Sequence, residues 1–186
     1  MTGEDTSARD QLLAATIDHV AQHGLADTSL RSLAAAIGTS HRMLIYHFGS
    51  KEGLLVEVVR AVEARQRETL DALRANEADS LADVMRLLWR DVSDPSRWPH
   101  ERLFFEMYGR ALQGRPGTEP LLEGVVEPWL DKAAQVGARH GLDPQTTRAR
   151  ARLGVATVRG LLLDLLATGD RAGVDRAMEE FISFYE

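Results

Sequence analysis

Apolar residues recur at spacings of three and four along nearly the whole chain, the period of α-helices that bury one face. No stretch alternates apolar and polar residues as a half-buried strand would. The pattern therefore predicts an all-α fold of about nine to ten helices. The expected helices cover residues 8–23, 30–37, 41–48, 51–75, 81–92, 100–112, 119–140, 144–168 and 174–185.

Two of these expected helices are short and joined by a tight turn. Thr28 and Ser29 are favourable N-cap residues for the first of them, and Ser40 is placed to cap the second. Gly38, between the two helices, can adopt the left-handed backbone conformation that other residues avoid. Residues 29–48 therefore form a predicted helix-turn-helix.

The second short helix has one apolar side and one side with hydrogen-bonding groups. Leu44 and Phe48 are four residues apart, so both can face a core. At 100° per residue, the positions opposite and flanking that core side are Arg42, Met43, Tyr46, His41, Ile45 and His47. An arginine can bridge the two acceptors of guanine in the major groove, whereas hydroxyl groups and imidazoles more often contact phosphates.

The charge pattern changes the picture of this segment. The chain has a formal charge of −6, yet it has no acidic residue between Asp27 and Glu52. Arg31, Arg42 and Lys51 give this stretch a formal charge of +3. A positive face on an acidic protein indicates a polyanionic partner.

Three sequence runs together resemble the DNA-binding domain of the tetracycline-repressor (TetR) family of transcriptional regulators. They are HGLADTSLRSLA, the AAAIGTS turn and YHFGSKEGLL. The resemblance implies operator contacts by Ser29, Arg31, Ser40, His41, Arg42, Met43, Ile45, Tyr46, His47 and Lys51. Ile45 departs from the family, which commonly has a tyrosine at this position, so a thymine methyl group is its expected contact.

The expected organisation has three parts. Residues 1–7 form a disordered tail, residues 8–65 a DNA-binding head, and residues 66–186 a helical domain for effector binding and dimerisation. The long helix that begins at Lys51 connects head and helical domain. Such a connector can act as a lever, because tilting one end displaces the other.

The helix over residues 144–168 has more apolar surface than a small domain needs. The resemblance implies that it belongs to a dimer interface, for which the candidates are Val155, Val158, Leu162, Leu165 and Leu166. The alternative is a central helix buried within one protomer. Asp164 lies inside this apolar run, where we expect it to pair with an arginine or to lie at the rim.

Aromatic residues gather in the second half of the chain, where the resemblance implies an effector pocket. The pocket candidates are Trp89, Phe104, Phe105, Tyr108 and Trp129. Aromatic rings can wall a cavity for an apolar or aromatic effector, and they can equally fill a core. Glu106 and Arg110 have the spacing of an ordinary surface ion pair.

Several classes of function lack support in the sequence. The chain has no cysteine, no apolar run of membrane-spanning length and a polar N-terminus, which together favour a cytoplasmic protein. No catalytic motif, phosphate-binding glycine loop or cofactor motif is found. His19 and His23 have metal-ligand spacing but no third ligand, so no metal is expected. Arginine outnumbers lysine 20 to 2, as is typical of bacterial genomes with high GC content.

The sequence therefore predicts a homodimeric, ligand-responsive DNA-binding regulator of transcription, of the repressor type. It would bind a palindromic operator, because one short helix makes too few contacts for useful specificity. A small-molecule effector would release it. The alternative is a helical protein-interaction module without sequence-specific DNA binding.

Overall fold

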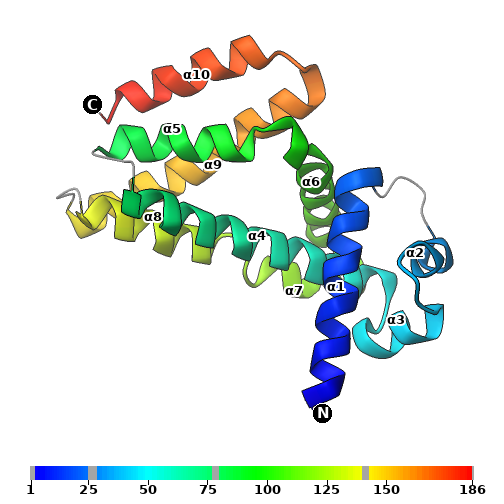
Figure 1. The fold of residues 1–186 in the computed structure, drawn as a ribbon. Coiled ribbons are helices and arrows are strands. Elements are labelled where there is room, and N and C mark those ends of the chain that lie inside the picture. Colours follow the sequence, from blue (N-terminus) through cyan, green and yellow to red (C-terminus); the bar gives the residue numbers. More distant parts are fainter. Residues whose placement is uncertain (1–2, 25–28, 77–79, 140–142, 186) are drawn as a thin grey trace. The chain divides into compact units, whose positions relative to one another are not determined.

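The computed structural model describes residues 3–24, 29–76, 80–139 and 143–185. Over these ranges the chain forms ten α-helices and one short 3-10 helix, with no β-strand (Figure 1). The all-α prediction is confirmed. The helices are α1 (Gly3–His23), α2 (Leu30–Ala36), α3 (His41–Phe48), α4 (Lys51–Asn76), α5 (Leu81–Val92), η1 (Pro95–Arg97), α6 (Trp98–Leu112), α7 (Glu119–Leu122), α8 (Glu127–Arg139), α9 (Pro144–Thr168) and α10 (Arg171–Ser183).

The predicted helix bounds differ from the structure mainly at two places. Helix α1 begins at Gly3, so residues 3–7 are helical although the sequence placed them in a disordered tail. The stretch 119–140, expected as one segment, divides into α7 and α8. Pro128 is the second residue of α8, in the first turn of a helix, where a missing N–H group costs no hydrogen bond.

The chain divides into two compact units. Unit 1 contains Met1–Glu63 and Pro99–Glu123, and unit 2 contains Ala64–Trp98 and Gly124–Glu186. Helix α4 contributes residues to both units. The functional division into a head at residues 8–65 and an effector domain at 66–186 stays a prediction.

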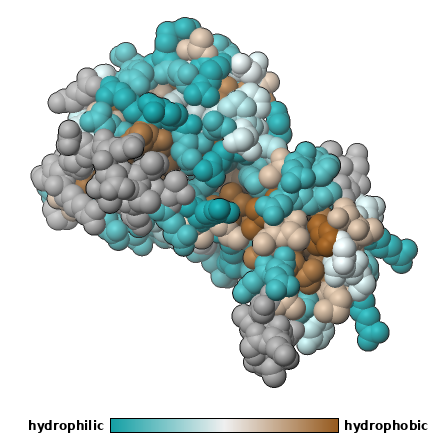
Figure 2. All heavy atoms as spheres, viewed as in Figure 1, coloured by the Kyte–Doolittle hydropathy of each residue, from teal (hydrophilic) through white to brown (hydrophobic). Residues whose placement is uncertain are grey.

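Unit 1 is built on the helices that the sequence assigned to the head. Its core contains Leu33, Leu44 and Leu54, all essentially inaccessible to solvent. Figure 2 shows hydrophobic residues where α1, α2 and α3 meet, with hydrophilic residues on the outer parts. Helices α6 and α7 contact the other helices of this unit through polar groups, among them a His100 ring nitrogen that lies 3.2 Å from the Ile17 carbonyl oxygen and Arg60, which donates to the Pro120 carbonyl.

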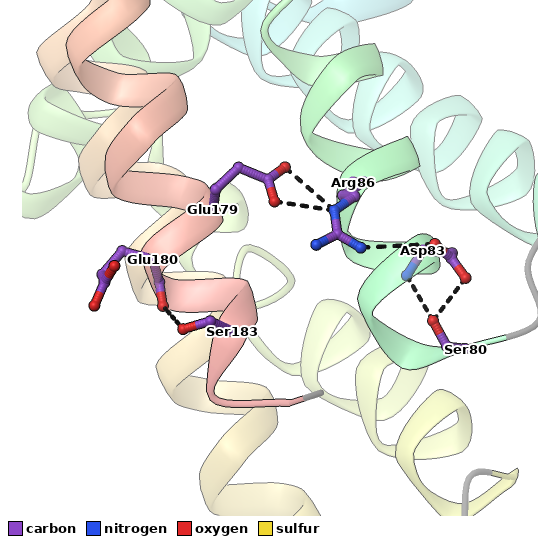
Figure 3. Close-up of polar contacts among 6 residues, drawn as sticks. All are labelled: Ser80, Asp83, Arg86, Glu179, Glu180 and Ser183. Atoms are coloured by element: carbon purple, nitrogen blue, oxygen red, sulfur yellow. Dashed lines mark hydrogen bonds and ion pairs between the residues drawn. The ribbon is translucent and has the colours of Figure 1, made fainter.

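Unit 2 is a set of packed helices in which α9 contacts chiefly α8 and α10, and α5 contacts α10. Polar contacts reinforce the α5–α10 pair (Figure 3). Arg86 Nε donates to both carboxylate oxygens of Glu179, at 3.0 and 3.3 Å. The indole N–H of Trp89, which is buried, donates to Asp175 Oδ1 at 2.7 Å. Trp89, a pocket candidate, therefore has a clear role in the packing of this unit.

None of the helices in the described ranges has both the length and the apolar character that crossing a membrane requires.

Candidate nucleic-acid interface

Side-chain caps fix the starts of the two helices of the helix-turn-helix. Ser29 Oγ accepts from the Ser32 N–H at 3.1 Å, and Ser40 Oγ accepts from the Met43 N–H at 3.2 Å. Both caps are confirmed as predicted; Thr28, the other predicted cap residue, lies outside the described residues. Each cap satisfies a backbone donor that the first turn of a helix leaves unpaired.

The turn between α2 and α3 depends on Gly38. Its φ is +73°, in the left-handed region that favours glycine. The N–H of Thr39, the next residue, donates to the Ala34 carbonyl at 2.9 Å and closes the end of α2. The chain can therefore enter α3 two residues later, which sets the angle between the helices.

The inner side of α3 anchors it to its neighbours. Leu44 and Phe48 are buried, as predicted. The guanidinium of Arg9, on α1, lies 5.1 Å from the centroid of the Phe48 ring and also pairs with Glu57, on α4, at 2.6 Å. One arginine thus links three helices of unit 1, so that α3 is held at a defined position.

The outer side of α3 faces solvent. His41, Arg42, Met43, Ile45 and Tyr46 are all exposed, and 68% of the Tyr46 surface is accessible. Ser29, Arg31 and Ser40 are exposed too, and Lys51 is half-buried. Most of the predicted contact residues are therefore accessible to solvent, and His47 is the least accessible of those on α3.

His47 is half-buried, and its Nε2 atom is inaccessible to solvent. Its ring lies edge-on to that of Tyr46, with 4.9 Å between the centroids. Among the predicted contacts on α3, His47 has the least geometric support for reaching a phosphate.

Gly53, in the first turn of α4, allows α3 and α4 to approach closely. A Cβ atom at this position would lie 2.4 Å from the backbone carbonyl oxygen of Phe48 and 3.3 Å from Ser50 Oγ. The first distance is far below van der Waals contact, so the approach requires glycine. The sequence pattern does not predict this role, although a glycine inside a helix is unfavourable enough to indicate a packing reason.

The segment 99–123 meets unit 1 at the start of α4. Gly117 has a φ of +83°, and a Cβ atom there would contact Glu52 Cβ and Ser50 Oγ, each at 3.4 Å. Arg110 pairs with Glu106 at 2.6 Å, as predicted, and also lies 3.9 Å from Glu52. Glu52, the first acidic residue after the basic stretch, therefore has a basic partner.

The five predicted pocket residues fall into two groups. Phe104, Phe105 and Tyr108 belong to unit 1, where the Phe104 ring centroid lies 5.1 Å from that of Phe105 and 5.5 Å from that of Tyr108. Trp89 and Trp129 belong to unit 2. A pocket lined by all five residues stays a prediction.

The predicted dimer contacts on α9 need correction. Leu162 and Leu165 are buried within the protomer, and Val155, Val158 and Leu166 are half-buried. The prediction was wrong for Leu162 and Leu165, because the protomer's own helices, chiefly α8 and α10, pack against α9. Asp164 is exposed, as expected for a residue at the rim.

A different row of residues along α9 is exposed and contains only uncharged residues. Leu153 and Leu163 are 55% and 51% accessible, although leucine is usually buried. With their small neighbours they repeat at alternating spacings of four and three, the seam of paired helices. We name this the α9 row: Ala149, Leu153, Ala156, Gly160, Leu163 and Ala167, all exposed.

A family model matches the helix-turn-helix region, and relatives match longer parts of the chain. The family described as "Bacterial regulatory proteins, tetR family" matches residues 12–58, which include the helix-turn-helix. The HTH-type transcriptional regulatory protein RaaS of Mycobacterium tuberculosis is 29% identical over 178 residues, which cover 89% of this chain and 74% of that protein. The HTH-type transcriptional regulator BetI of Stenotrophomonas maltophilia is 29% identical over 86 residues, 46% of this chain; the chain thus spans less than half (44%) of that relative.

Solved structures have the same fold. A transcriptional regulator from Rhodococcus sp. RHA1 superposes with a TM-score of 0.75 at 20% identity, covering 95% of this chain and 94% of that one. The multidrug binding protein EbrR, solved with imidazole, gives a TM-score of 0.66 at 27% identity, covering 97% of this chain and 90% of that one.

A regulator from Saccharomonospora viridis, solved with choline, gives a TM-score of 0.70 at 21% identity, covering 97% of this chain and 95% of that one. RaaS and BetI are both described as regulators of transcription of the HTH type. Their helix-turn-helix matches the one whose capped, outward-facing α3 is described above. Residues 12–58 of this chain, which contain its helix-turn-helix, therefore match the TetR family of bacterial regulatory proteins, and this match supports DNA-binding regulation of transcription.

Proposed function

We propose that this regulator is a repressor that binds a palindromic operator as a homodimer and dissociates when a small-molecule effector binds. The observation that carries the proposal is the pairing of two surfaces: the outward face of α3 and the exposed α9 row. The first face suits DNA, and the second suits another copy of the same chain. No observation favours the alternative of a protein-interaction module.

The outward face of α3 can read bases and hold phosphates. Arg42 is the proposed base reader, because its guanidinium is exposed and can donate two hydrogen bonds to guanine. Ser40, Tyr46 and Lys51 are proposed phosphate contacts. Met43 and Ile45 supply apolar surface that fits a thymine methyl group.

Dimerisation follows from both surfaces. A two-fold pair of α3 helices would enter successive major grooves, about 34–36 Å apart. The α9 row is proposed as the seam between the protomers, since its small residues let two helices approach closely and Leu153 and Leu163 would fill the remaining space. A Cβ atom at Gly160 meets nothing within 4 Å in the protomer, so this position is open to a partner.

Effector release is proposed to act through α4. Residues of α4 belong to both units, so a ligand that favours a different position of its C-terminal half would shift the head. EbrR, a multidrug binding protein, supports the assignment of a small-molecule effector. Operator affinity would fall by the difference between the ligand's affinities for the two states.

Arg42→Ala is expected to weaken binding to the operator by about 1–3 kcal/mol and to relax specificity at one base position. The physical reason is the loss of a bidentate contact to a base edge. Gel-shift titration of the operator and of single-base variants would measure this change. Arg176→Ala, at an exposed position on α10, is the control and should leave affinity unchanged; an unchanged affinity for Arg42→Ala would remove Arg42 as a base reader.

Tyr46→Phe is expected to weaken binding to operator and random DNA equally, by about 0.5–1.5 kcal/mol, because one hydroxyl-to-phosphate hydrogen bond is lost. The two titrations must be run at the same salt concentration, since phosphate binding depends steeply on salt. A change in the ratio of the two affinities would instead make Tyr46 a base contact.

A further inference from the structure

A buried guanidinium nitrogen in unit 2 lacks a hydrogen-bond partner. It is Nη1 of Arg67, on the second half of α4, and it has no partner among the described residues. Because burying a polar donor without an acceptor costs free energy, and more so for a charged group, such an atom is uncommon in a folded protein.

An aromatic ring lies close to the Arg67 guanidinium. The guanidinium carbon lies 5.5 Å from the centroid of the Trp129 ring, on α8. Trp129 in turn packs, with Leu81 and Leu88, against the buried pair Val84 and Val136. Trp129, Leu81, Leu88 and Arg67 are all half-buried, so a small molecule can contact part of each side chain, whereas Nη1 itself is inaccessible and must shift to meet a ligand.

The arrangement selects the charge of a ligand. The face of an aromatic ring attracts cations, but at Trp129 the protein's own Arg67 already takes that role. A cationic ligand would have to displace Arg67 or bind beside a like charge. An anionic group, in contrast, would supply the acceptor that Nη1 lacks.

A carboxylate fits this site better than other anions. Its two oxygens match the planar fork of a guanidinium, and one negative charge balances the one positive charge. The rest of the ligand would contact the half-buried indole and leucine side chains, which requires an apolar or aromatic body.

We propose that Arg67 and Trp129 form a binding site for a carboxylate with an apolar or aromatic body, and that this compound class is the effector. The effector role rests on the proposed function; the binding itself does not. The choline-bound relative shows that the fold can hold a cation, and Arg67 directs this chain toward the opposite charge.

The test compares ligands that differ only in charge. Calorimetry on the full-length protein without DNA would measure the binding of 2-naphthylacetate and octanoate, the corresponding amides, and the corresponding primary amines. We expect at least one carboxylate to bind about tenfold or more tightly than its amide and amine, because hydrogen bonds between two charged groups are stronger than those to a neutral group. Equal or tighter binding of the amide or amine, or failure of both carboxylates to bind at millimolar concentration, would overturn the proposal.

Variants assign the preference to Arg67. Arg67→Gln should abolish the preference for the carboxylate. Arg65→Gln, at an exposed position two residues earlier on the same helix, should keep that preference. Retention of the preference in Arg67→Gln would contradict the assignment. The melting temperature without ligand should not fall in Arg67→Gln, whereas a purely structural arginine would lower it. The wild-type ligand comparison decides the proposal even if a variant does not fold.

Release of the operator is a separate measurement. Carboxylate binding without effect on the operator complex would leave the site intact and overturn the effector role. If the wild-type protein without ligand does not bind an operator, the proposed function is contradicted. The calorimetric evidence for the carboxylate site is not affected by that result.

Discussion

Leu153→Glu combined with Leu163→Glu is expected to make the protein monomeric at micromolar concentration and to lower operator affinity by about 10³-fold or more, to the level of random DNA. Both leucines are exposed on the α9 row, so the substitutions would place four carboxylates in the proposed two-fold seam. Sedimentation velocity and gel-shift titration measure the two effects.

The matched control is Leu112→Glu, which makes the same chemical change at an exposed leucine in unit 1. It should leave both the oligomeric state and the operator affinity unchanged. Because Leu153 and Leu163 are exposed in the protomer, the double variant should retain its helical circular dichroism. A double variant that remains dimeric would exclude the α9 row as the interface.

Gly53→Ala is expected to lower the free energy of unfolding by about 1–3 kcal/mol, because the added methyl group would meet the Phe48 carbonyl oxygen and force α3 and α4 apart. Operator affinity should fall as well, since α3 carries the proposed base contacts. Urea unfolding and gel-shift titration measure the two effects. A dimer must be compared at a fixed protomer concentration, because association contributes to stability.

Gly109→Ala is the opposite case within the same unit. Gly109 lies inside α6, and a Cβ atom there would meet nothing within 4 Å. Alanine is the better helix former, so this variant should be more stable by about 0.5–1 kcal/mol. If both variants changed stability in the same direction, the close approach at Gly53 would not be the cause.

Local features of the head could be predicted because short-range chemistry determines them. Ser29 and Ser40 each cap the helix that the sequence assigned to them. Gly38 turns the chain, and Leu44 and Phe48 face inward, because a helix has a fixed period and only one side of α3 is apolar. The exposure of Arg42 and Tyr46 follows from the same geometry.

The orientation of α9 could not be predicted in the same way. Apolar residues surround this helix on several sides, so its period does not identify which side the protomer covers. Helices α8 and α10 pack against the side with Leu162 and Leu165, and Leu153 and Leu163 face outward. That choice depends on contacts between segments far apart in the sequence.

Two further features depend on tertiary contacts. The need for glycine at position 53 arises from the distance to the Phe48 carbonyl, which local pattern does not contain. Likewise, the grouping of Pro99–Glu123 with unit 1 rests on contacts such as the hydrogen bond from Arg60 to the Pro120 carbonyl. The unpaired nitrogen of Arg67 belongs to this class too, because only packing reveals which donors lack acceptors.

A footprint of the full-length protein on the DNA upstream of its own gene, compared with random DNA at the same salt concentration, would show whether two copies bind a palindromic operator. A homodimeric regulator should protect two half-sites, related by a palindrome, whose centres lie one helical turn of DNA (about 34–36 Å) or a multiple of it apart. Protection of a single half-site, or protection only at concentrations that also cover random DNA, would contradict homodimeric operator binding.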